Sequence, residues 1–323
     1  MVAKTIADWL QVPIFCIRQA QEPVYTADAA GIVSDQRRNY LSGILGLLLC
    51  IRFWKQLLAA RIVICNTCLT FPFAVLARLL GKRVVCVIHE SAYKNVLYRV
   101  ALFWSKKAAH RIITPSRLAF EEIGIPAQKW QVIPNALART YSEECPSVDS
   151  HAAEARILFV GGGRPYKGDH LFQAIQEHCR IHHPRLQLHA VGDDAYVRAH
   201  GFGRKLTPQI YGTYHLILVL TDNRVWKETF GLVGCEAAAC RCLPMFTDRF
   251  AYAELWSEYA DQLFLPTYAA GPIVEQLVRL LRDRLQLDRL RDAARQHALQ
   301  LTDARSVAAQ WRNVLQRIDT QPA

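Results

Sequence analysis

A glycine-rich segment in the second half of the chain has the composition of a diphosphate-binding turn. Residues 161–168 read GGGRPYKG, directly after the apolar run ILFV and before a predicted helix. Glycines let a backbone approach a ligand closely, and a helix start presents N–H groups at the positive end of its dipole. Arg164 and Lys167 add two cations. The segment matches neither the dinucleotide-binding glycine pattern nor the P-loop, and a tight turn with two solvated cations is the alternative.

A pair of glutamates with seven residues between them follows about 70 residues later. Residues 227–239 read KETFGLVGCEAAA, in which Glu228 precedes a predicted helix and Glu236 lies inside it among Gly, Cys and Ala. A carboxylate among small apolar residues is costly unless it is paired. Ribose hydroxyls are one partner for Glu236, with the amides around Phe230–Leu232 facing a phosphate or a sugar. A buried arginine is the other partner, and this segment alone does not choose between them.

Both segments need strands to position them, and the hydrophobic pattern predicts two successive series of strands and helices. Continuous runs of β-branched and apolar residues, such as 83–88, are typical of parallel strands that are covered on both faces. We expect strands at 13–17, 61–65, 83–88, 111–114 and 132–134, and then at 156–160, 186–191, 215–220 and 243–246. We expect helices at 35–59, 72–80, 95–110, 116–123, 168–183, 231–240, 272–285, 287–302 and 304–318.

Two such series predict an α/β protein with two doubly wound parallel sheets. The glycine-rich segment and the glutamate pair both follow strands of the second sheet, at the carboxyl ends where open α/β sheets bind ligands. Residues 139–154 read RTYSEECPSVDSHAAE, are polar and have no periodicity, which predicts a linker. We therefore expect one domain over residues 1–145 and a second over 146–323.

The charge of the chain is concentrated in its first half. The length of 323 residues fits two domains, and 51% hydrophobic with 21% charged residues excludes a disordered or fibrous chain. Residues 1–145 hold 18 Lys and Arg against 9 Asp and Glu, or +9, whereas residues 146–323 hold 21 against 19, or +2. The basic half predicts an anionic partner, which can be nucleic acid, a membrane surface or a phosphorylated substrate, unless its charges are simply solvated.

Targeting and membrane-spanning signals are absent from the sequence pattern, and we expect a cytoplasmic protein. The first ten residues contain Asp8 and lack a long apolar core before a small-residue cleavage site. The most apolar stretch, 41–54, is interrupted by Arg52 and is shorter than the roughly 20 residues that span a bilayer.

The ten cysteines are expected to be reduced in that compartment. A Cys-x-x-Cys at 65–68 and a Cys-x-Cys at 240–242 are similar in spacing to metal-binding or redox motifs. Neither has a second pair or a neighbouring histidine at a suitable spacing, and the first lies in an apolar run. Buried structural thiols are therefore favoured over zinc ligands.

These segments together resemble the GT-B glycosyltransferases, in particular the large retaining family 4 of nucleotide-sugar-dependent enzymes. The resemblance covers most of residues 60–265 and implies two Rossmann-like domains that face a cleft, with the C-terminal helix packing near the interdomain region. Its motifs are FVGGGRPYKG at 159–168, VGDD at 191–194, ETFGLVGCEA at 228–237, RIITPSRLAFEEI at 111–123 and WQVIPNAL at 130–137.

Roles for individual residues follow from the resemblance alone. It implies that Glu228 lies near the donor sugar, that Glu236 binds the donor ribose, and that Lys167 holds the diphosphate. His89, at a strand end, matches a histidine that faces the sugar or the acceptor in the family, although a hydrogen bond to backbone is an alternative use for it. The expected catalytic residues are Glu228, Lys167 and His89, and the expected donor-binding residues are Gly162, Gly163, Arg164, Lys167, Phe230, Gly231, Leu232 and Glu236.

The chain departs from the family pattern at three places. Gly162 stands where the family usually has Arg, and Arg164 is the candidate substitute. Arg241 stands where the family usually has Gly, just before a predicted strand. The family's opening strand and Gly-rich loop are missing from the first domain, whose residues 5–10 look like the first helix.

The resemblance implies transfer of a sugar from a UDP- or GDP-linked donor to an acceptor hydroxyl, with retention and without a metal or other cofactor. We expect a glycan or lipid-linked acceptor and a role in bacterial surface polysaccharide or lipopolysaccharide assembly. The basic helix at 98–111, with Arg99, Lys106, Lys107 and Arg111, would lie on anionic lipid at the cytoplasmic face of the inner membrane, or be a solvated face.

Two other functions are weighed against this one. A non-catalytic relative would bind a nucleotide sugar or a partner glycosyltransferase; the missing loop and Gly162 favour it, and the retention of both Glu228 and Glu236 opposes it. A tRNA-directed glycosyltransferase ranks lower, because the basic half has no evident aromatic–basic platform, and we expect no nucleic-acid partner.

Overall fold

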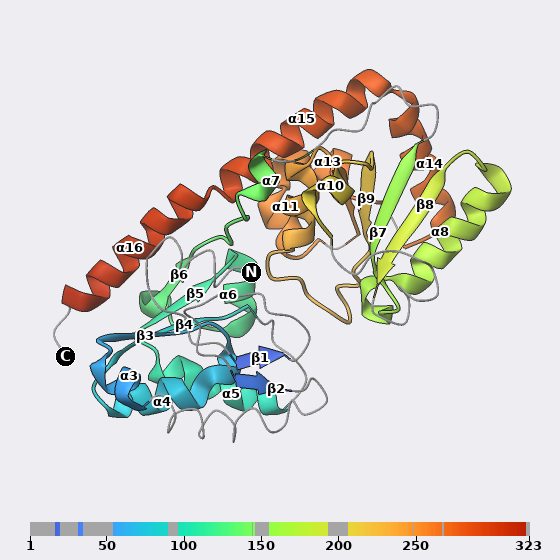
Figure 1. Cartoon of the computed structure of the whole chain (residues 1–323). Helices are drawn as coiled ribbons and strands as arrows, with labels where there is room; N and C mark the ends of the chain where they lie inside the picture. Colours follow the sequence, from blue (N-terminus) through green and yellow to red (C-terminus); the bar gives the residue numbers. More distant parts are fainter. Residues whose placement is uncertain are drawn as a thin grey trace. The chain divides into compact units, whose positions relative to one another are not determined.

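The computed structural model of the chain describes residues 17–19, 32–34, 54–89, 96–143, 145, 155–192, 206–247, 249–266 and 268–320. The chain forms two compact units, one of Met1–Ala136 with Ala304–Ala323 and the other of Leu137–Asp303 (Figure 1). The expected boundary between residues 145 and 146 therefore falls inside the second unit, and the last helix belongs to the first unit. Each unit is built on its own four-stranded parallel sheet.

The sheet of the first unit has its four strands in sequence order. The strands are β3 (Ile62–Cys65), β4 (Arg83–Val87), β5 (Arg111–Thr114) and β6 (Trp130–Val132). Helix α3 (Trp54–Ala59) precedes β3, and α4 (Phe71–Leu79), α5 (Val96–Ala108) and α6 (Arg117–Ile123) connect the strands. These elements lie where the sequence predicts them, except that β6 begins two residues before the expected strand 132–134. Most of the expected strand 13–17 and of the expected helix 35–59 lies outside the described residues, and a parallel pair, β1 (Ile17–Gln19) with β2 (Ile32–Ser34), was not expected.

The last helix, α16 (Ala304–Thr320), covers one face of this sheet. Its buried residues recur every three or four positions and form one apolar stripe. The stripe consists of Val307, Trp311, Val314 and Ile318, and it packs in one buried cluster with Val85, Val87, Ile113 and Ile133 of the sheet. The intervening strand residues Val84, Cys86 and Ile112 face a different cluster with α4. Both faces of β4 and β5 are thus covered, which is why these strands read as continuous apolar runs.

The second unit has the strand order β10-β9-β7-β8. The strands are β7 (Arg156–Gly162), β8 (Gln187–Gly192), β9 (Leu216–Val219) and β10 (Leu243–Phe246). Because β7 pairs with β8 on one side and with β9 on the other, the chain reverses its direction across the sheet between β7 and β9. Such a reversal is a topological switch point, where open α/β sheets form ligand-binding crevices beyond the carboxyl ends of the strands.

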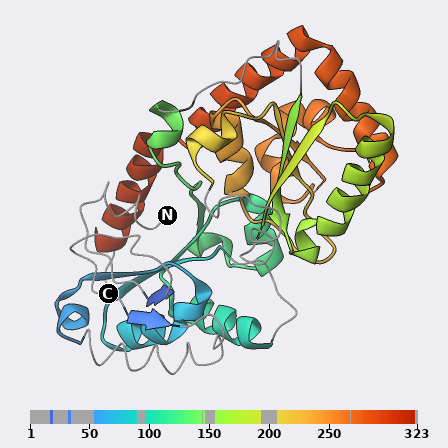
Figure 2. The same ribbon diagram turned by 45° about the vertical axis from the view of Figure 1, so that its right-hand side comes forward.

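Helices cover both faces of the second sheet (Figures 1 and 2). On one side α8 (Asp169–His182) packs against α14 (Ala270–Arg282), and on the other α11 (Leu232–Ala239) packs against α15 (Arg284–Leu301). These helices match the expected ones within a few residues. Four short helices were not expected, because a single turn has no detectable periodicity: α7 (Thr140–Glu143), α10 (Pro208–Tyr211), α12 (Ala251–Leu255) and α13 (Ala260–Leu263).

The segment predicted as a linker contains α7 and a disulfide. Cys145 is joined to Cys240, at the end of α11, with the two Cα atoms 5.0 Å apart. The expectation that all ten cysteines are reduced is therefore wrong for this pair, because folding brings together residues that are 95 positions apart in the sequence. The described free cysteines are buried, as expected: Cys65, Cys68, Cys86, Cys179, Cys235 and Cys242.

The turn after α11 accommodates an arginine at the position where the resembled family has glycine. Arg241 has φ 57°, a left-handed conformation that costs a residue with a Cβ atom about 1–2 kcal/mol. Its Nε lies 2.9 Å from Oδ1 of Asp292, and its carbonyl accepts a hydrogen bond of 2.6 Å from Nε of the buried Arg291. The next strand, β10, begins where it was expected, so the substitution does not displace it.

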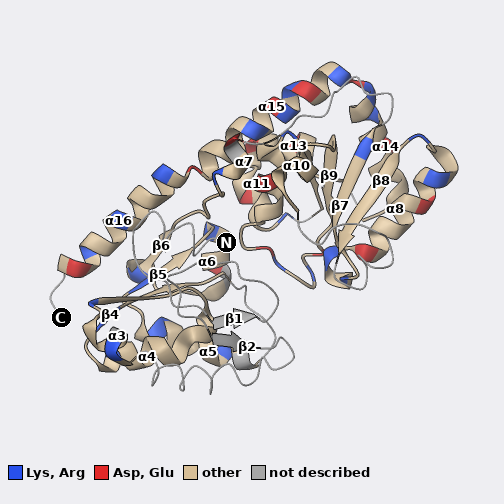
Figure 3. Ribbon diagram, in the orientation of Figure 1, with Lys and Arg blue, Asp and Glu red and all other residues tan. Residues whose placement is uncertain are grey.

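The uneven charge is visible on the helices of the two units (Figure 3). In the first unit, α3, α4 and α5 carry Lys and Arg without any Asp or Glu. In the second unit, α8 and α15 carry both signs. Among the helices that the structure describes, none is long and apolar enough to cross a bilayer.

Candidate functional site

The glycine-rich turn after β7 passes close to the loop after β9. Gly161 and Gly168 have φ values of 136° and 84°, which favour glycine. A Cβ atom on Gly168 would overlap the carbonyl of Leu220, which directly follows β9. Pro165–Lys167 forms one 3₁₀ turn, and α8 begins immediately after Gly168. Glycine is therefore needed at position 168 for the turn to lie against the neighbouring loop.

Lys167 and Glu228 meet at the switch point of the second sheet. Lys167 follows β7 and Glu228 follows β9, the two strands between which the chain reverses. Nζ of Lys167 and Oε1 of Glu228 form an ion pair, in which the side chains are 23% and 15% exposed. Partial burial weakens the screening that makes most surface pairs ineffective. The sequence predicts both residues at this edge of the sheet, and the structure brings them into contact.

Two aromatic side chains that the sequence analysis did not single out flank this ion pair. The rings of Tyr166 and Trp226 lie 5.0 Å apart, and Nζ of Lys167 lies 5.9 Å from the centre of each. The N–H of Asp222 donates a hydrogen bond of 3.2 Å to the carbonyl of Tyr166, which ties the turn to the loop after β9. In the sequence, each of these aromatic residues lies within two positions of an expected site residue, and this proximity could have indicated them.

The start of α11 is held by a glycine packed on an aromatic ring. Gly231 precedes the helix with φ 70°, and a Cβ atom there would overlap the ring of Tyr252. Phe230 is buried in the core of the unit, and Leu232 is the first residue of the helix. The first N–H groups of a helix lack partners within the helix and carry its positive dipole end. The expected donor-binding segment 230–232 therefore coincides with a helix N-terminus.

Glu236 lies in the interior of α11 and is 9% exposed. Its partner is not the arginine that the sequence suggested as the alternative to ribose. The hydroxyl of Tyr211 donates a hydrogen bond of 3.0 Å to Oε2 of Glu236, and the ring of the buried Tyr141 lies 6.2 Å from that of Tyr211. Burial raises the pKa of Glu236 to about 7, against the opposing effect of the Tyr211 hydrogen bond.

The remaining expected donor-binding residues lie on the same turn as Lys167. Gly162 is the buried last residue of β7, opposite Gly192 of β8 and next to an irregularity in the pairing. Gly163 and Arg164 are exposed, and the N–H of Arg164 donates a hydrogen bond of 3.1 Å to the carbonyl of Gly161. The substitution of Arg164 for the family's arginine at position 162 stays a prediction.

His89 belongs to the first unit and is described with that unit. It lies two residues after β4, and its Nε2 is 3.2 Å from Oδ1 of Asn66, which directly follows the neighbouring strand β3. The structure thus gives His89 a side-chain partner, and the hydrogen bond to backbone stays an alternative use for it. The role of His89 toward the sugar or the acceptor stays a prediction.

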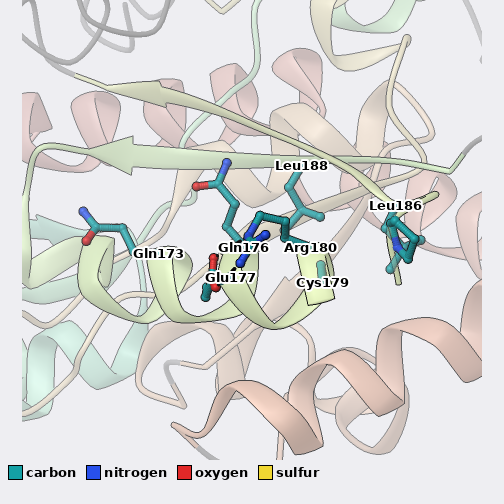
Figure 4. A pocket seen from close by; sticks show the side chains of 8 residues that line it. Gln173, Gln176, Glu177, Cys179, Arg180, Leu186 and Leu188 are labelled. Atoms are coloured by element: carbon teal, nitrogen blue, oxygen red, sulfur yellow. Dashed lines mark hydrogen bonds and ion pairs between the residues drawn. The ribbon is translucent and has the colours of Figure 1, made fainter. Parts of the chain in front are cut away.

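A hollow of about 410 Å³ lies elsewhere on the second unit (Figure 4). It is lined by Gln173, Gln176, Glu177 and Arg180 of α8, together with residues such as Leu186 and Leu188 at the edge strand β8. The lining includes none of the expected site residues. No group of three or more His, Cys, Asp or Glu among the described residues could hold a metal ion.

Comparison with known protein families finds a match in the first half of the chain. The family model described as Glycosyltransferase Family 4 matches residues 9–139. No curated protein matches the sequence. The match includes the segments at 111–123 and 130–137 on which the resemblance partly rests.

Comparison with solved structures covers almost the whole chain. HepE of Anabaena, in complex with UDP, is 17% identical with a TM-score of 0.71, over 95% of this chain and 100% of HepE. Sucrose-phosphate synthase of Thermosynechococcus elongatus is 15% identical with a TM-score of 0.76, over 98% and 92% of the two chains. A trehalose-6-phosphate synthase studied for glycosyl transfer with retention is 12% identical with a TM-score of 0.64, over 99% and 97%.

The chain therefore has the GT-B glycosyltransferase fold, as its sequence motifs predict. The resemblance to the family 4 glycosyltransferases is confirmed over residues 9–139 by the family match, and the structural similarity over both halves shows the fold.

Proposed function

We propose that this chain is a retaining glycosyltransferase that moves a sugar from a nucleotide-diphosphate sugar to an acceptor hydroxyl. The observation that carries the proposal is the contact of Lys167 with Glu228 at the switch point of the second sheet. A cation, a carboxylate, a glycine turn and a helix N-terminus meet at this edge of the sheet. HepE, which shares the fold, is known in complexes with UDP and with UDP-glucose, which supports a nucleotide-sugar donor.

The proposed chemistry uses this charge arrangement. When the bond between the anomeric carbon and the diphosphate breaks, negative charge develops on the leaving diphosphate. Lys167, with Arg164 on the same turn and the first amides of α11, would offer preorganised positive charge to it. Donor binding would exchange the Lys167–Glu228 ion pair for a contact between Lys167 and phosphate. Glu228 would then be released toward the donor sugar, which is the place that the family resemblance implies for it.

The donor is the only small molecule that this mechanism requires. We take it to be a UDP- or GDP-linked sugar and include no metal or other cofactor. Glu236, which lies inside α11, would accept hydrogen bonds from the donor ribose, as the resemblance implies. Retention at the anomeric carbon is supported by the structural similarity to trehalose-6-phosphate synthase, for which retention is described.

A donor screen tests the proposal. UDP- and GDP-linked sugars are incubated with the full chain and released nucleotide is measured, with Lys167→Ala and Glu236→Ala as site variants. Arg180→Ala, which removes an exposed cation from α8, is the control. We expect release by the wild type and by Arg180→Ala, and a large loss in both site variants. Equal release by all four proteins would show that the site is wrong, and donor binding without release would favour the non-catalytic alternative.

We further propose that the acceptor is a glycan or lipid-linked molecule and that α5 lies on an anionic membrane surface during bacterial surface polysaccharide or lipopolysaccharide assembly. Large apolar residues form an exposed stripe on this helix, whereas Ala101, Ser105 and Ala108 are buried. Phe103 and Trp104 in this stripe are 50% and 45% exposed, and Nζ of Lys107 lies 5.8 Å from the ring centre of Phe103. Exposed aromatic and basic residues on one amphipathic helix favour the surface of an anionic bilayer.

Sedimentation with vesicles tests the membrane proposal. The full chain is mixed with phosphatidylcholine vesicles that contain or lack phosphatidylglycerol, at low and high salt. We expect binding only to the anionic vesicles, weakened by salt, and lost in the Phe103→Glu/Trp104→Glu variant. Leu285→Glu, at an exposed apolar residue of the second unit, is the matched control. Binding that does not depend on lipid charge would contradict the proposal.

A further inference from the structure

We propose that Tyr211 and Tyr141 are positioning residues that orient the Glu236 carboxylate toward the donor ribose, and so set the selectivity for ribonucleotide over 2′-deoxyribonucleotide diphosphates. The inference rests on the proposed function, in which Glu236 accepts hydrogen bonds from the ribose. It adds two residues that lie outside the glycine-rich turn and outside the glutamate pair.

The two tyrosines lie on two separate helices beside the helix that carries Glu236. Tyr211 is the last residue of α10, and its hydroxyl donates to Oε2 of Glu236 at 3.0 Å. Tyr141 lies in α7, which packs against α11. The tyrosines are 0% and 3% exposed, and their ring centres lie 6.2 Å apart. A buried donor that packs beside a second buried ring fixes the orientation of the carboxyl group more firmly than a flexible partner does.

The number of hydrogen bonds leaves room for a ligand. A carboxylate has about four lone-pair sites, and the hydroxyl of Tyr211 uses one of them. The remaining sites can accept from the 2′- and 3′-hydroxyls of a ribose. An arginine in the same position would engage both oxygens with a planar fork and would add a positive charge. A neutral hydroxyl holds Glu236 in place and preserves its capacity as an acceptor.

Both tyrosines are themselves fixed by local structure. The hydroxyl of Thr207 caps α10 by accepting a hydrogen bond of 3.4 Å from the N–H of Ile210. The segment that carries Tyr141 is attached to α11 by the disulfide between Cys145 and Cys240. The supporting groups of Glu236 are therefore held on rigid elements, which is what precise orientation of a binding group requires.

Calorimetric titration with UDP and with 2′-deoxy-UDP tests the inference. The proteins are the wild type, Tyr211→Phe and Tyr141→Phe, which lose only a hydroxyl, and Tyr214→Phe as the matched control. Tyr214 is a buried tyrosine of the same unit whose ring packs on His189 at 5.5 Å. GDP and 2′-deoxy-GDP replace the uridine pair if the wild type prefers guanine. The readout is the ratio of the two dissociation constants, which a general loss of stability does not change.

We expect the wild type and Tyr214→Phe to bind UDP about tenfold more tightly than 2′-deoxy-UDP, which is the effect of one hydrogen bond to a charged group. In Tyr211→Phe and Tyr141→Phe this ratio should fall severalfold. Glu236→Gln, which keeps the shape of the side chain, should lower it as well.

The outcomes separate the inference from the function on which it rests. If both tyrosine variants keep the wild-type ratio, or weaken both nucleotides equally, the tyrosines are structural only and the inference is overturned. If Glu236→Gln alone lowers the ratio, the ribose contact stands and the positioning role is rejected. A wild type that binds UDP and GDP with no measurable affinity contradicts the proposed function itself. Thermal melting shows which variants are folded.

Discussion

Glu228 and Glu236 are eight residues apart, and the second unit compensates their charges in different ways. Glu228 lies in a loop and forms an ion pair with Lys167 across the switch point. Glu236 lies inside a helix and accepts a hydrogen bond from the hydroxyl of the buried Tyr211. Glu228 is thus compensated by an opposite charge. Glu236 is stabilised by a neutral hydrogen-bond donor, and burial raises the pKa of its carboxyl group.

The difference suggests two separate tasks within one site. An ion pair at the edge of a sheet can be exchanged for another charged partner, such as a phosphate, because the charge of Lys167 is then compensated by the new partner. A carboxyl group held by a buried hydroxyl is costly to move and is suited to hold a fixed hydrogen-bond partner. Glu228 would therefore change partners during a reaction cycle, and Glu236 would keep its position.

Removal of Lys167 should have the largest effect on activity. We expect Lys167→Ala to lower the rate of sugar transfer by about 10²–10³-fold, the usual loss when a preorganised group that stabilises developing charge is removed. The measurement is the initial rate of donor-dependent nucleotide release at saturating donor. The double variant Lys167→Ala/Glu228→Gln sharpens the comparison. It removes the carboxylate that Lys167→Ala leaves without its ion-pair partner, so we expect it to recover stability without recovering activity. Full activity in Lys167→Ala would remove the ion pair from the mechanism.

The glycine before α11 should show the largest effect on stability. Gly231→Ala combines a left-handed φ of 70° with overlap of the new Cβ atom with Tyr252. Gly81→Ala is the matched control, because Gly81 has φ 71° and a Cβ atom added there would meet no heavy atom within 4 Å. We expect the overlap to cost about 2 kcal/mol more than the control, as measured by urea denaturation. Equal costs would mean that backbone conformation alone matters at Gly231.

The pH dependence of stability should reveal the buried carboxyl group. The pKa of Glu236 is about 7 in the folded protein and near 4.5 in the unfolded chain. Between these values the folded protein binds more protons, so its stability falls as pH rises from about 4.5 to 7. The loss amounts to roughly 3 kcal/mol at most. Urea denaturation at pH 5, 6, 7 and 8 should show this fall in the wild type relative to Glu236→Gln, and parallel curves for the two proteins would refute it.

A substitution at Arg241, just after the helix that carries Glu236, should have the smallest effect on the free energy of unfolding. Arg241→Gly relieves a left-handed conformation that costs about 1–2 kcal/mol and loses a partly exposed ion pair worth about 0.2–1 kcal/mol. We expect the free energy of unfolding to rise by at most about 2 kcal/mol on balance. Arg241→Ala keeps the strained conformation, loses the ion pair, and should lower the free energy of unfolding. If Arg241→Gly is the less stable of the two, the contacts with α15 outweigh the backbone strain.

Local patterns in the sequence are sufficient to predict the regular elements and part of the site. The bounds of β5 and β10 agree with the expected strands, because continuous apolar runs mark strands that are buried on both faces. The glycine-rich turn and the start of α11 were also predicted, because glycines with positive φ and a helix start leave a signature in adjacent residues. Lys167 and Glu228 were predicted at one edge of the sheet because each follows a strand of the same parallel sheet.

Contacts between distant residues were decided by tertiary structure alone. Tyr211 lies in a four-residue helix that has no periodicity, and it finds Glu236 only when α10 packs beside α11. The stripe on α16 shows that this helix covers some apolar surface, but the choice of the first unit depends on which sheet face is left to cover. Cys145 and Cys240 likewise meet only after the chain has folded. Such pairings depend on strand order and packing, which residues far apart in the chain determine together.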